Sequence, residues 1–503
     1  MDKELKKNLA LVTDTLKEAN LYYHACHVLG YDQQTIAPKK AREAQGETSA
    51  FLGNKGFQLV KSKKFIKAAE YLYENRADLG KYDSVLAKSL HREYQRVKRI
   101  TPKMQHEFSL IYNKAFVDWL NAKEASDFSI FEKSLGKVRE IELKQIALEK
   151  VHRNTTYDAL LDHYERGMTE NILDETFGTC KERLLPLLEK IKKSKKQIRR
   201  DFMSRTVPEE AQRRMAKYLL NLICFDFERG AITTTEHPFM DDIAVDDIRV
   251  TTHYYEDNFA SSMFSVLHEG GHALFGQNTP RVHYKHFIEG EKTLGMHESV
   301  SRFYENRIGR SKAFIDLVYD KCKEIFPEVF ADASAEEFYE AVNVVNPSLI
   351  RIEADEFTYT FHIIIRYELE KMIINEGVKI SDLPRLWADK YEEYLGVRPD
   401  SDKTGVLQDV HWSGGFGYFP TYALGNMYNA MYINKMKEKY DINKLISGGN
   451  FDIISDWMTK HVYKKADRLE PQEWIRDITG RAFTPKDYLD YLEEKFGAIY
   501  GLS

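Results

Sequence analysis

Two histidines and a glutamate in one short segment have the spacing of a metal site. His268 and His272 are four residues apart in SSMFSVLHEGGHALF, which runs from Ser261 to Phe275. In a helix, side chains at this spacing project from one face, one turn apart, as two ligands of one ion must. Glu269 lies about 100° further around the helix, so it cannot join the ligands but can reach a water molecule at the ion. The segment therefore predicts a zinc site with Glu269 as the general base of a hydrolysis reaction.

A third ligand is expected from a second helix downstream. Glu298 lies 26 residues after His272, within Gly295 to Arg310, whose pattern is helical. A glutamate in this position resembles the third ligand of the glutamate-type zincins. Two imidazoles and one carboxylate leave the fourth position of zinc open for water, which is typical of a catalytic rather than a structural site. The predicted cofactor is one Zn²⁺ per chain, held by His268, His272 and Glu298, with Co²⁺ able to take its place.

The same spacing also occurs on surface helices that carry two histidines by chance. The apolar residues around this pair favour a buried helix instead, in which unpaired histidines would be costly. Gly270 and Gly271 each cost about 1 kcal/mol in a helix interior relative to alanine. We therefore expect another element to approach the helix closely at these two glycines.

The helix that carries the histidines has recognisable ends. Asn258 or Ser261 can cap its start with a side-chain oxygen. Gly276, followed by Pro280, is the expected stop. These limits place both histidines in the helix interior, away from the ends.

Helical spacing of apolar residues dominates the chain from Lys3 to about Leu220 and returns from the metal segment to the carboxyl terminus. The exception is VDDIRVTTHYY at 245–255, which is β-branched, aromatic and alternating, and predicts a strand. Residues 413–417 are glycine-rich and predict a loop.

These elements predict an all-α, mainly helical zincin with a small antiparallel β element beside the active-site helix and a deep substrate groove. A chain of 503 residues exceeds the usual size of a single core. We expect one catalytic unit over 1–503, in which two helical subdomains, 1–220 and 221–503, flank the groove.

Composition argues against several other classes. The formal net charge of -5 gives no electrostatic case for nucleic-acid or membrane binding, and the basic run at 192–200 lacks the aromatics of a nucleic-acid site, which favours a solvated helix face or turn. No stretch approaches the roughly 18 apolar residues of a membrane span, and the amino terminus has no apolar signal core, so a cytoplasmic location is predicted. The 4 cysteines form no C-x-x-C pair, which predicts free thiols.

Six short motifs follow one another along the chain. They are H-P-F at His237, Pro238 and Phe239; D-x-R-x-T at Asp247, Arg249 and Thr251; H-E-x-x-H at His268, Glu269 and His272; H-E-S at His297, Glu298 and Ser299; I-R-x-x-A-D at Ile350, Arg351, Ala354 and Asp355; and G-x-x-Q-D-x-H-W at Gly405, Gln408, Asp409, His411 and Trp412. In this order they resemble the carboxypeptidase Taq family of metallocarboxypeptidases, and the likeness covers nearly the whole chain. One departure is Tyr31-Asp32, where the family has Trp-Asp, and it is expected to touch no chemistry.

The resemblance implies a zinc-dependent carboxypeptidase that releases single carboxyl-terminal amino acids from peptides, and it implies a homodimer. It also implies that H-P-F, D-x-R-x-T and the arginine of I-R-x-x-A-D close one end of the groove. There His237, Arg249 and Arg351 would hold the terminal carboxylate of the peptide, a task to which a guanidinium fork is well suited.

Both arginines also have a structural interpretation. In a strand, Asp247 and Arg249 point to one face, so an ion pair between them is an equally good account of Arg249. Arg351 is expected in an apolar helix, where it would serve a site or pair with Asp355 one turn further on.

Donors for the developing oxyanion are expected near the glycine-rich loop. His411 precedes that loop, and Tyr418 and Tyr422 follow it. A tetrahedral intermediate needs hydrogen-bond donors, and related helical zincins use tyrosine or histidine for this purpose. Most of the 30 tyrosines are expected in the core, and the sequence does not separate Tyr418 from Tyr422 as the donor.

Two other functions fit parts of the pattern. A helical zinc oligoendopeptidase would apply the same chemistry to internal bonds and would cleave peptides whose carboxyl terminus is amidated. A helical scaffold with a vestigial metal site would lack a ligand or the general base, and neither is missing here. The preferred residue at the cleavage site, the physiological metal and the source of the peptides are not determined by the sequence.

Overall fold

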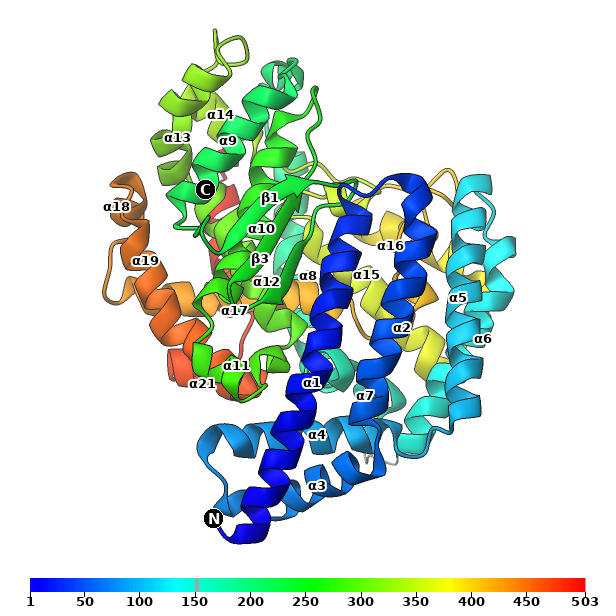
Figure 1. Cartoon of the computed structure of the whole chain (residues 1–503). Helices are drawn as coiled ribbons and strands as arrows, with labels where there is room; N and C mark the ends of the chain where they lie inside the picture. Colours follow the sequence, from blue (N-terminus) through cyan, green and yellow to red (C-terminus); the bar gives the residue numbers. More distant parts are fainter. Residues whose placement is uncertain (150–152, 503) are drawn as a thin grey trace.

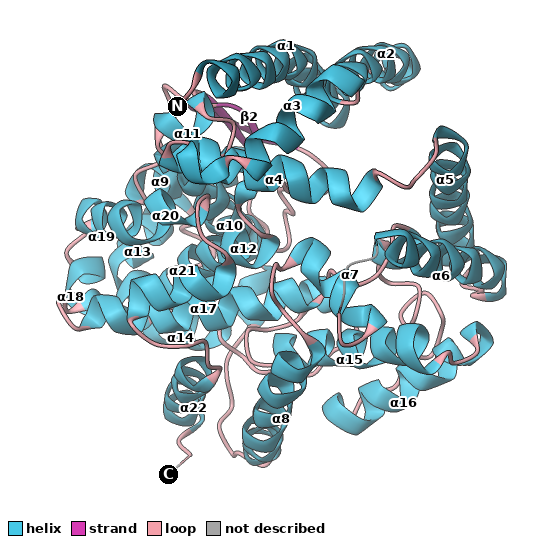
Figure 2. Ribbon diagram, turned by 90° about the horizontal axis from the view of Figure 1, so that it is seen from below, coloured by secondary structure: helices cyan, strands magenta, loops and turns pink. Residues whose placement is uncertain are grey.

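The computed structural model describes residues 1–149 and 153–502. Helices make up most of this part of the chain, and the strands within it form one three-stranded sheet, which confirms the mainly helical fold (Figures 1 and 2). The amino-terminal helices are α1 Lys3–Gln34, α2 Arg42–Val60, α3 Lys63–Glu74, α4 Lys81–Val97, α5 Pro102–Ala125, α6 Ser129–Glu149, α7 Thr156–Tyr164, α8 Glu170–Lys192 and α9 Glu209–Leu222.

The helices after the sheet carry most of the motif residues. They are α10 Phe259–Asn278, α11 Arg281–Lys285, α12 Leu294–Arg302, α13 Lys312–Ile325, α14 Ala335–Ala341, α15 Tyr359–Lys371, α16 Leu383–Leu395, α17 Pro420–Lys437, α18 Ile442–Ser447, α19 Phe451–Met458, α20 Lys464–Ala466, α21 Pro471–Thr479 and α22 Lys486–Tyr500. Helix α12 lies between α10 and α17 and packs against both (Figure 2).

The sheet consists of β1 Gly230–Thr234, β2 Met240–Ala244 and β3 Asp247–Thr252, in the order β1-β3-β2. The predicted strand is therefore β3, the central one. It pairs antiparallel with β2, as expected, and parallel with β1, which the sequence analysis did not foresee. Ile248 and Val250 are fully buried, and β3 packs on α10 (Figure 1).

Helix α10 starts where predicted and ends later. The side chain of Asn258 accepts a hydrogen bond from the backbone N–H of Ser261 at 3.3 Å. Gly276 does not stop the helix, which continues to Asn278 before Pro280. A Cβ at Gly276 would lie 3.1 Å from the side chain of Ile248, so this glycine lets β3 approach the helix.

The segment around Arg351 is not one long helix. Arg351–Glu353 forms a 3₁₀ turn, and α15 begins only at Tyr359. Asp355 separates them, because its carboxylate accepts hydrogen bonds from the backbone N–H groups of Phe357 and Thr358 and therefore caps the turn before α15. The expected pairing of Arg351 with Asp355 is wrong for the same reason.

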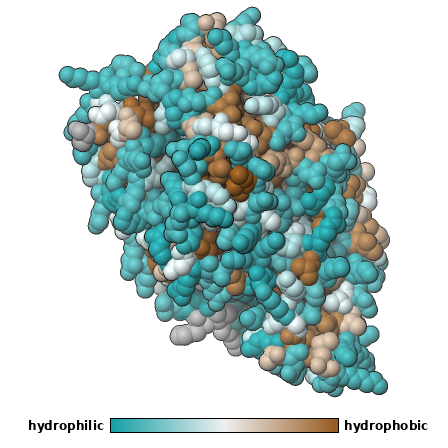
Figure 3. Space-filling model, turned by 90° about the vertical axis from the view of Figure 1, so that its left-hand side faces the viewer, coloured by the Kyte–Doolittle hydropathy of each residue, from teal (hydrophilic) through white to brown (hydrophobic). Residues whose placement is uncertain are grey.

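The buried side chains of the described residues form two clusters. The large core contains residues from Ala115 to Tyr500, and a small one joins α1, α3 and α4 through side chains such as Val12, Phe65 and Leu86. The division into subdomains at about residue 220 stays a prediction. The face in Figure 3 is mostly hydrophilic, with hydrophobic side chains scattered over it. Among the described helices, none has the length and apolar character that crossing a membrane requires.

The cysteines and the basic run at 192–200 can also be compared with their predictions. The 4 cysteines are free thiols, as predicted. The basic run follows the end of α8 and forms surface ion pairs, such as Lys196 with Glu340 and Arg199 with Asp201. This arrangement agrees with the predicted solvated turn.

Candidate metal centre

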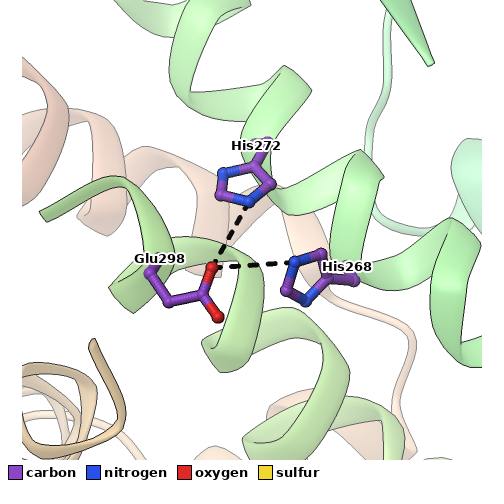
Figure 4. A group of neighbouring side chains, drawn as sticks. All are labelled: His268, His272 and Glu298. Atoms are coloured by element: carbon purple, nitrogen blue, oxygen red, sulfur yellow. Dashed lines mark ion pairs between the residues drawn. The ribbon is translucent and has the colours of Figure 1, made fainter. Parts of the chain in front are cut away.

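Three side chains from two helices converge on one point. His268 and His272 of α10 and Glu298 of α12 place one ligand atom each within 4.8 Å of one another. The Nε2 atoms of His268 and His272 lie 3.7 and 3.6 Å from Oε2 of Glu298. Figure 4 shows both imidazoles directed at the carboxylate. Such a cluster of two imidazoles and a carboxylate is the donor set of an open, catalytic zinc site.

Glycines bring these helices into contact. A Cβ on Gly271 would lie 2.7 Å from Cα of Ser301 on α12, and a Cβ on Gly270 would lie 2.8 Å from the side chain of Ile223. On the other side of α12, a Cβ on Gly425 of α17 would lie 2.8 Å from Cγ of Glu298. The predicted close approach at the two glycines of α10 is confirmed, and it sets the distance between the ligands.

Each histidine is oriented by a second contact. Nδ1 of His268 lies 2.9 Å from Oε2 of Glu305, and Nδ1 of His272 lies 2.6 Å from Nδ1 of His297. Both contacts use Nδ1 and therefore leave both Nε2 atoms toward Glu298. Glu305 is in a π-helical turn, Phe303–Gly309, that continues α12. Such outer contacts fix ring orientation in metal sites.

The charges around Glu298 keep it ionised. Burial would raise its pKa, but Arg302, His268 and His272 outweigh burial and hold the pKa well below its ordinary value. Arg302 donates from Nε to Oε1 at 2.7 Å, which leaves Oε2 toward the histidines. A carboxylate in this state is ready to bind a cation without first losing a proton.

Glu269 is buried beside the cluster without joining it. Burial raises its pKa, and the nearby His268 and His272 oppose that rise. Among the described residues its carboxylate forms no hydrogen bond or ion pair. It is thus free to interact with a small molecule at the centre.

Arg249 lies on the face of the sheet away from α10. Its Nε and Nη2 donate to the two carboxylate oxygens of Asp247 at 2.7 Å each, so the ion-pair interpretation is confirmed. The guanidinium also stacks on the ring of Tyr31, 4.9 Å from its centre. All three residues line a cavity of about 530 Å³ between α1 and the sheet. The departure from the family pattern at Tyr31 therefore lies beside Arg249, a residue proposed to bind the substrate.

Arg351 is 6% exposed and has a different carboxylate partner from the one predicted. Its Nε and Nη2 donate to Oδ1 of Asp409 at 3.0 and 2.8 Å, and its Nη1 donates to the hydroxyl of Tyr359 at 3.2 Å. Tyr359 also stacks under Arg302, 4.4 Å from the ring centre. Tyr359 thus connects the arginine beside Glu298 with Arg351.

The three predicted donor residues lie together next to Arg351. Nε2 of His411 is 3.2 Å from the hydroxyl of Tyr422, and the rings of Tyr418 and Tyr422 are 5.3 Å apart. Arg351 stacks on Tyr422 at 4.9 Å. Tyr422 stands one turn before Gly425, the residue that contacts Glu298, on α17. Burial lowers the pKa of His411 to about 4, despite Asp409, so this imidazole is neutral at pH 7.

His237 stands apart from these groups. It is exposed, in the connection between β1 and β2. Among the described residues it makes no hydrogen bond or ion pair with the residues of the metal cluster. Phe239 of the same motif is held by Thr251, whose Oγ1 accepts from the Phe239 N–H at 2.8 Å.

Comparison with known proteins decides the family. The family model for carboxypeptidase Taq (M32) metallopeptidases matches residues 11–496. Carboxypeptidase 1 of Bacillus subtilis is 37% identical over 489 residues, which cover 97% of each chain, and thermostable carboxypeptidase 1 of Thermus thermophilus is 36% identical over 487 residues, 94% of each. The crystal structure of the M32 carboxypeptidase from Deinococcus radiodurans superposes with a TM-score of 0.94 at 30% identity and covers all of both chains.

The chain belongs to the carboxypeptidase Taq (M32) family. It is a metallocarboxypeptidase, a peptide hydrolase, and this confirms the resemblance seen in the six motifs. Membership of a metallopeptidase family implies a catalytic metal, and the donor set of His268, His272 and Glu298 fits one.

Sequence reasoning missed several residues around the centre of this M32 carboxypeptidase. Glu305 and Arg302 lie within 295–310, which the sequence predicts to be helical, but no role was predicted for them. Their spacing of seven and four residues from Glu298 was the available signal. Nothing in the sequence marked Tyr359 as a site residue except its place near I-R-x-x-A-D. Arg366 and Glu370 of α15 are charged residues in an apolar helix, which is the pattern of groups that serve a site.

Proposed function

We propose that the chain is a zinc-dependent carboxypeptidase that releases single amino acids from the carboxyl end of peptides, with Glu269 as general base. The observation that carries the proposal is the cluster of His268, His272 and Glu298 with the unpaired carboxylate of Glu269 beside it. Zn²⁺ held by the three ligands would supply Lewis-acid activation of the scissile carbonyl and of the attacking water.

Glu269 takes the proton of the attacking water and passes it to the leaving amine. Its carboxylate has no hydrogen-bond or ion-pair partner among the described residues, so it can accept a proton without breaking a contact. Glu305 and His297 contact the Nδ1 atoms of His268 and His272 and fix the orientation of the two rings.

Tyr422 is the better candidate for the oxyanion donor, assisted by His411. If Nε2–H of the neutral His411 donates to the Tyr422 oxygen, the Tyr422 hydroxyl proton can be donated either to the substrate or to the neighbouring Tyr418 oxygen. Tyr422 stands one turn before Gly425, which packs on Glu298, and burial and, to a smaller extent, the charge of Glu298 raise the pKa of both Tyr422 and Tyr418. Tyr418 packs against it as a second possible donor in the same group.

Arg351 is proposed to bind the terminal carboxylate of the peptide. Its contacts with Asp409 and Tyr359 use three N–H groups and leave two of the five that a guanidinium has. Arg249 and His237 are proposed to complete this end of the site. Arg249 would contribute less, because Asp247 already occupies the fork of its guanidinium.

A pair of matched peptides tests the direction of cleavage. A peptide with a free carboxyl terminus should release its last residue, whereas its amidated twin should lose nearly all turnover, since the group that the arginines bind is gone. Equal cleavage of both peptides would favour an oligoendopeptidase.

Metal analysis tests the cofactor. One Zn²⁺ per chain is expected, with activity lost on chelation and restored by Zn²⁺ or Co²⁺. The homodimer and the cytoplasmic location implied at the sequence level stay proposals, which light scattering and cell fractionation test.

A further inference from the structure

The segment that carries His411 and leads into Tyr418 is bound by two charged side chains of α15. Arg366 and Glu370 are one helical turn apart and both fully buried, in a helix whose other side chains are mostly apolar. Charged residues in such a place are rare unless they have partners. Four of their seven hydrogen-bond partners, Gln408, Asp409, Trp412 and Gly417, belong to one segment, residues 408–417, and the others are His362, Tyr391 and Tyr157.

Arg366 binds the start of that segment. Its Nε donates to Oδ2 of Asp409 at 2.7 Å, and its Nη2 donates to Oε1 of Gln408 at 2.8 Å. Asp409 is therefore shared between Arg366 on one oxygen and Arg351 on the other. These contacts fix the backbone two residues before His411.

Glu370 binds the rest of the segment. Oε1 accepts a hydrogen bond from Nε1 of Trp412 at 2.9 Å, and Oε2 accepts one from the backbone N–H of Gly417 at 2.9 Å. The third donor is the hydroxyl of Tyr157 on α7, 2.6 Å from Oε2. Burial raises the pKa of Glu370 to about 7, against the effect of these donors.

The anchors are direct chain neighbours of the proposed donor residues. Trp412 follows His411, and Gly417 precedes Tyr418. Between the anchors the backbone is not regular: Gly415 and Gly417 have φ of +128° and +98°, and a Cβ on Gly417 would lie 2.8 Å from the backbone of Leu160. A segment of this kind has no hydrogen-bonded repeat to hold it, so its side chains are placed by what it is attached to.

We infer that Glu370, with Arg366 beside it, is a positioning residue that sets where His411 and Tyr418 stand relative to the metal centre. The expected effect on kcat rests on the proposed function, whereas the expected effect on the position of the segment does not. Glu370 acts through Trp412 and Gly417 and does not itself contact the substrate.

The test compares three variants in the full-length, metal-loaded protein. Glu370→Gln keeps one acceptor oxygen but presents an NH₂ group either to the one donor at Oε1, Trp412, or to the two donors at Oε2, Gly417 and Tyr157. Trp412→Phe removes one of the two donors on the segment and leaves Glu370 intact. Tyr157→Phe removes the donor outside the segment and is the matched control, because it costs the same carboxylate one hydrogen bond.

Two measurements decide the outcome. Amide hydrogen exchange of the peptide covering residues 405–418 should accelerate at least several-fold in Glu370→Gln and Trp412→Phe, and much less in Tyr157→Phe. kcat should fall roughly 10- to 100-fold in the first two variants with KM changed by about twofold or less, as expected from small displacements of catalytic groups. Zinc content should remain one per chain in all three.

Unchanged exchange and unchanged kcat in Glu370→Gln would overturn the inference, and so would equal effects of all three variants, which would show a general loss of stability. If the wild-type protein releases no amino acid from peptides, the proposed function fails, while the exchange measurement still decides whether Glu370 holds the segment. If Glu370→Gln does not fold, the same two measurements on Trp412→Phe test the inference.

Discussion

The metal centre and the region around Arg351 lie on either side of Tyr359, and they are built in different ways. All three proposed ligands come from α10 and α12, two helices whose backbones touch at Gly271 and Ser301. Around Arg351 the groups come instead from a 3₁₀ turn, an irregular segment and two helices, and they are joined by buried ion pairs.

Because of this difference, residues of the metal centre can be changed with little effect on stability, whereas residues around Arg351 cannot. A ligand or base on α10 can be changed while the helix stays packed, because its apolar side chains and glycines do the packing. Around Arg351, the charges that would bind substrate also neutralise one another. Asp409 lies between Arg351 and Arg366, so removing Asp409 would leave two buried guanidinium groups without their shared partner, whereas removing Arg351 leaves Asp409 paired with Arg366 alone.

The largest effect is expected at the metal centre. Glu269→Gln should lower kcat by on the order of 10³-fold or more, because the variant cannot accept the proton of water. Its zinc content and unfolding temperature should match the wild type, since Glu269 holds no other group in place. Peptide hydrolysis and metal analysis check this, and substantial remaining turnover would exclude Glu269 as the base.

Arg351→Ala should damage both function and fold. We expect kcat/KM for peptides with a free carboxyl terminus to fall by about 10²-fold or more. The free energy of unfolding should fall by roughly 1–3 kcal/mol, because Oδ1 of Asp409 loses its charged hydrogen-bond donor while Arg366 still pairs with Oδ2. Denaturant unfolding and kinetics measure the two effects. Arg385→Ala, at an exposed ion pair on α16, is the control and should change neither. An Arg351→Ala protein of normal stability would contradict the comparison.

Glu305→Gln should weaken the metal site without removing a ligand. The variant loses the charge that orients His268, and changes to such outer contacts typically cost about 10- to 100-fold in metal affinity. Competition with a chelator measures this. Glu324→Gln, on the exposed side of α13, should bind zinc like the wild type. If both variants bind zinc equally, the contact to Glu305 does not tune the centre.

Buried carboxylates in the two regions should give opposite pH dependence of stability. Burial raises the pKa of Glu165, beneath α12, to about 7, so the folded protein binds more protons than the unfolded chain between about 4.5 and 7 and stability falls as pH rises there. Burial would raise the pKa of Asp409 too, but Arg366 and Arg351 hold it well below its ordinary value, so its contribution is lost as pH falls below about 4.

Glu165→Gln should therefore flatten the dependence of unfolding free energy on pH between 4.5 and 7, by on the order of 1–3 kcal/mol. Melting curves at several pH values measure it. Glu175→Gln, an exposed residue of α8, should leave the curve unchanged. A Glu165→Gln curve parallel to that of the wild type would show that Glu165 does not titrate in this range.

The smallest effect is expected at Arg249. Its ion pair with Asp247 is part-exposed, so Arg249→Lys should alter stability by less than about 1 kcal/mol. KM should rise several-fold if Arg249 assists the peptide carboxylate, because lysine lacks the guanidinium fork. Arg229→Lys, at the neighbouring pair with Asp246, is the matched control. An effect as large as that of Arg351→Ala would show that the two arginines share the role equally.

The helical fold, the central strand of the sheet and the pairing of His268 with His272 could be predicted from local sequence patterns. The four-residue spacing of a helix and the two-residue spacing of a strand place side chains without reference to the rest of the chain. Glu298 lies on a second helix and was predicted from the resemblance to glutamate-type zincins rather than from spacing within one element. Even the close approach at Gly270 and Gly271 was visible locally.

Only the tertiary structure decided which charges meet. Arg351 pairs with Asp409, 58 residues away, rather than with Asp355, and Glu370 reaches Trp412 and Gly417 across more than 40 residues. The parallel pairing of β1 with β3 is likewise a long-range contact. For these distant pairs, the partner is selected by which elements pack together, and no local spacing in the sequence records that choice.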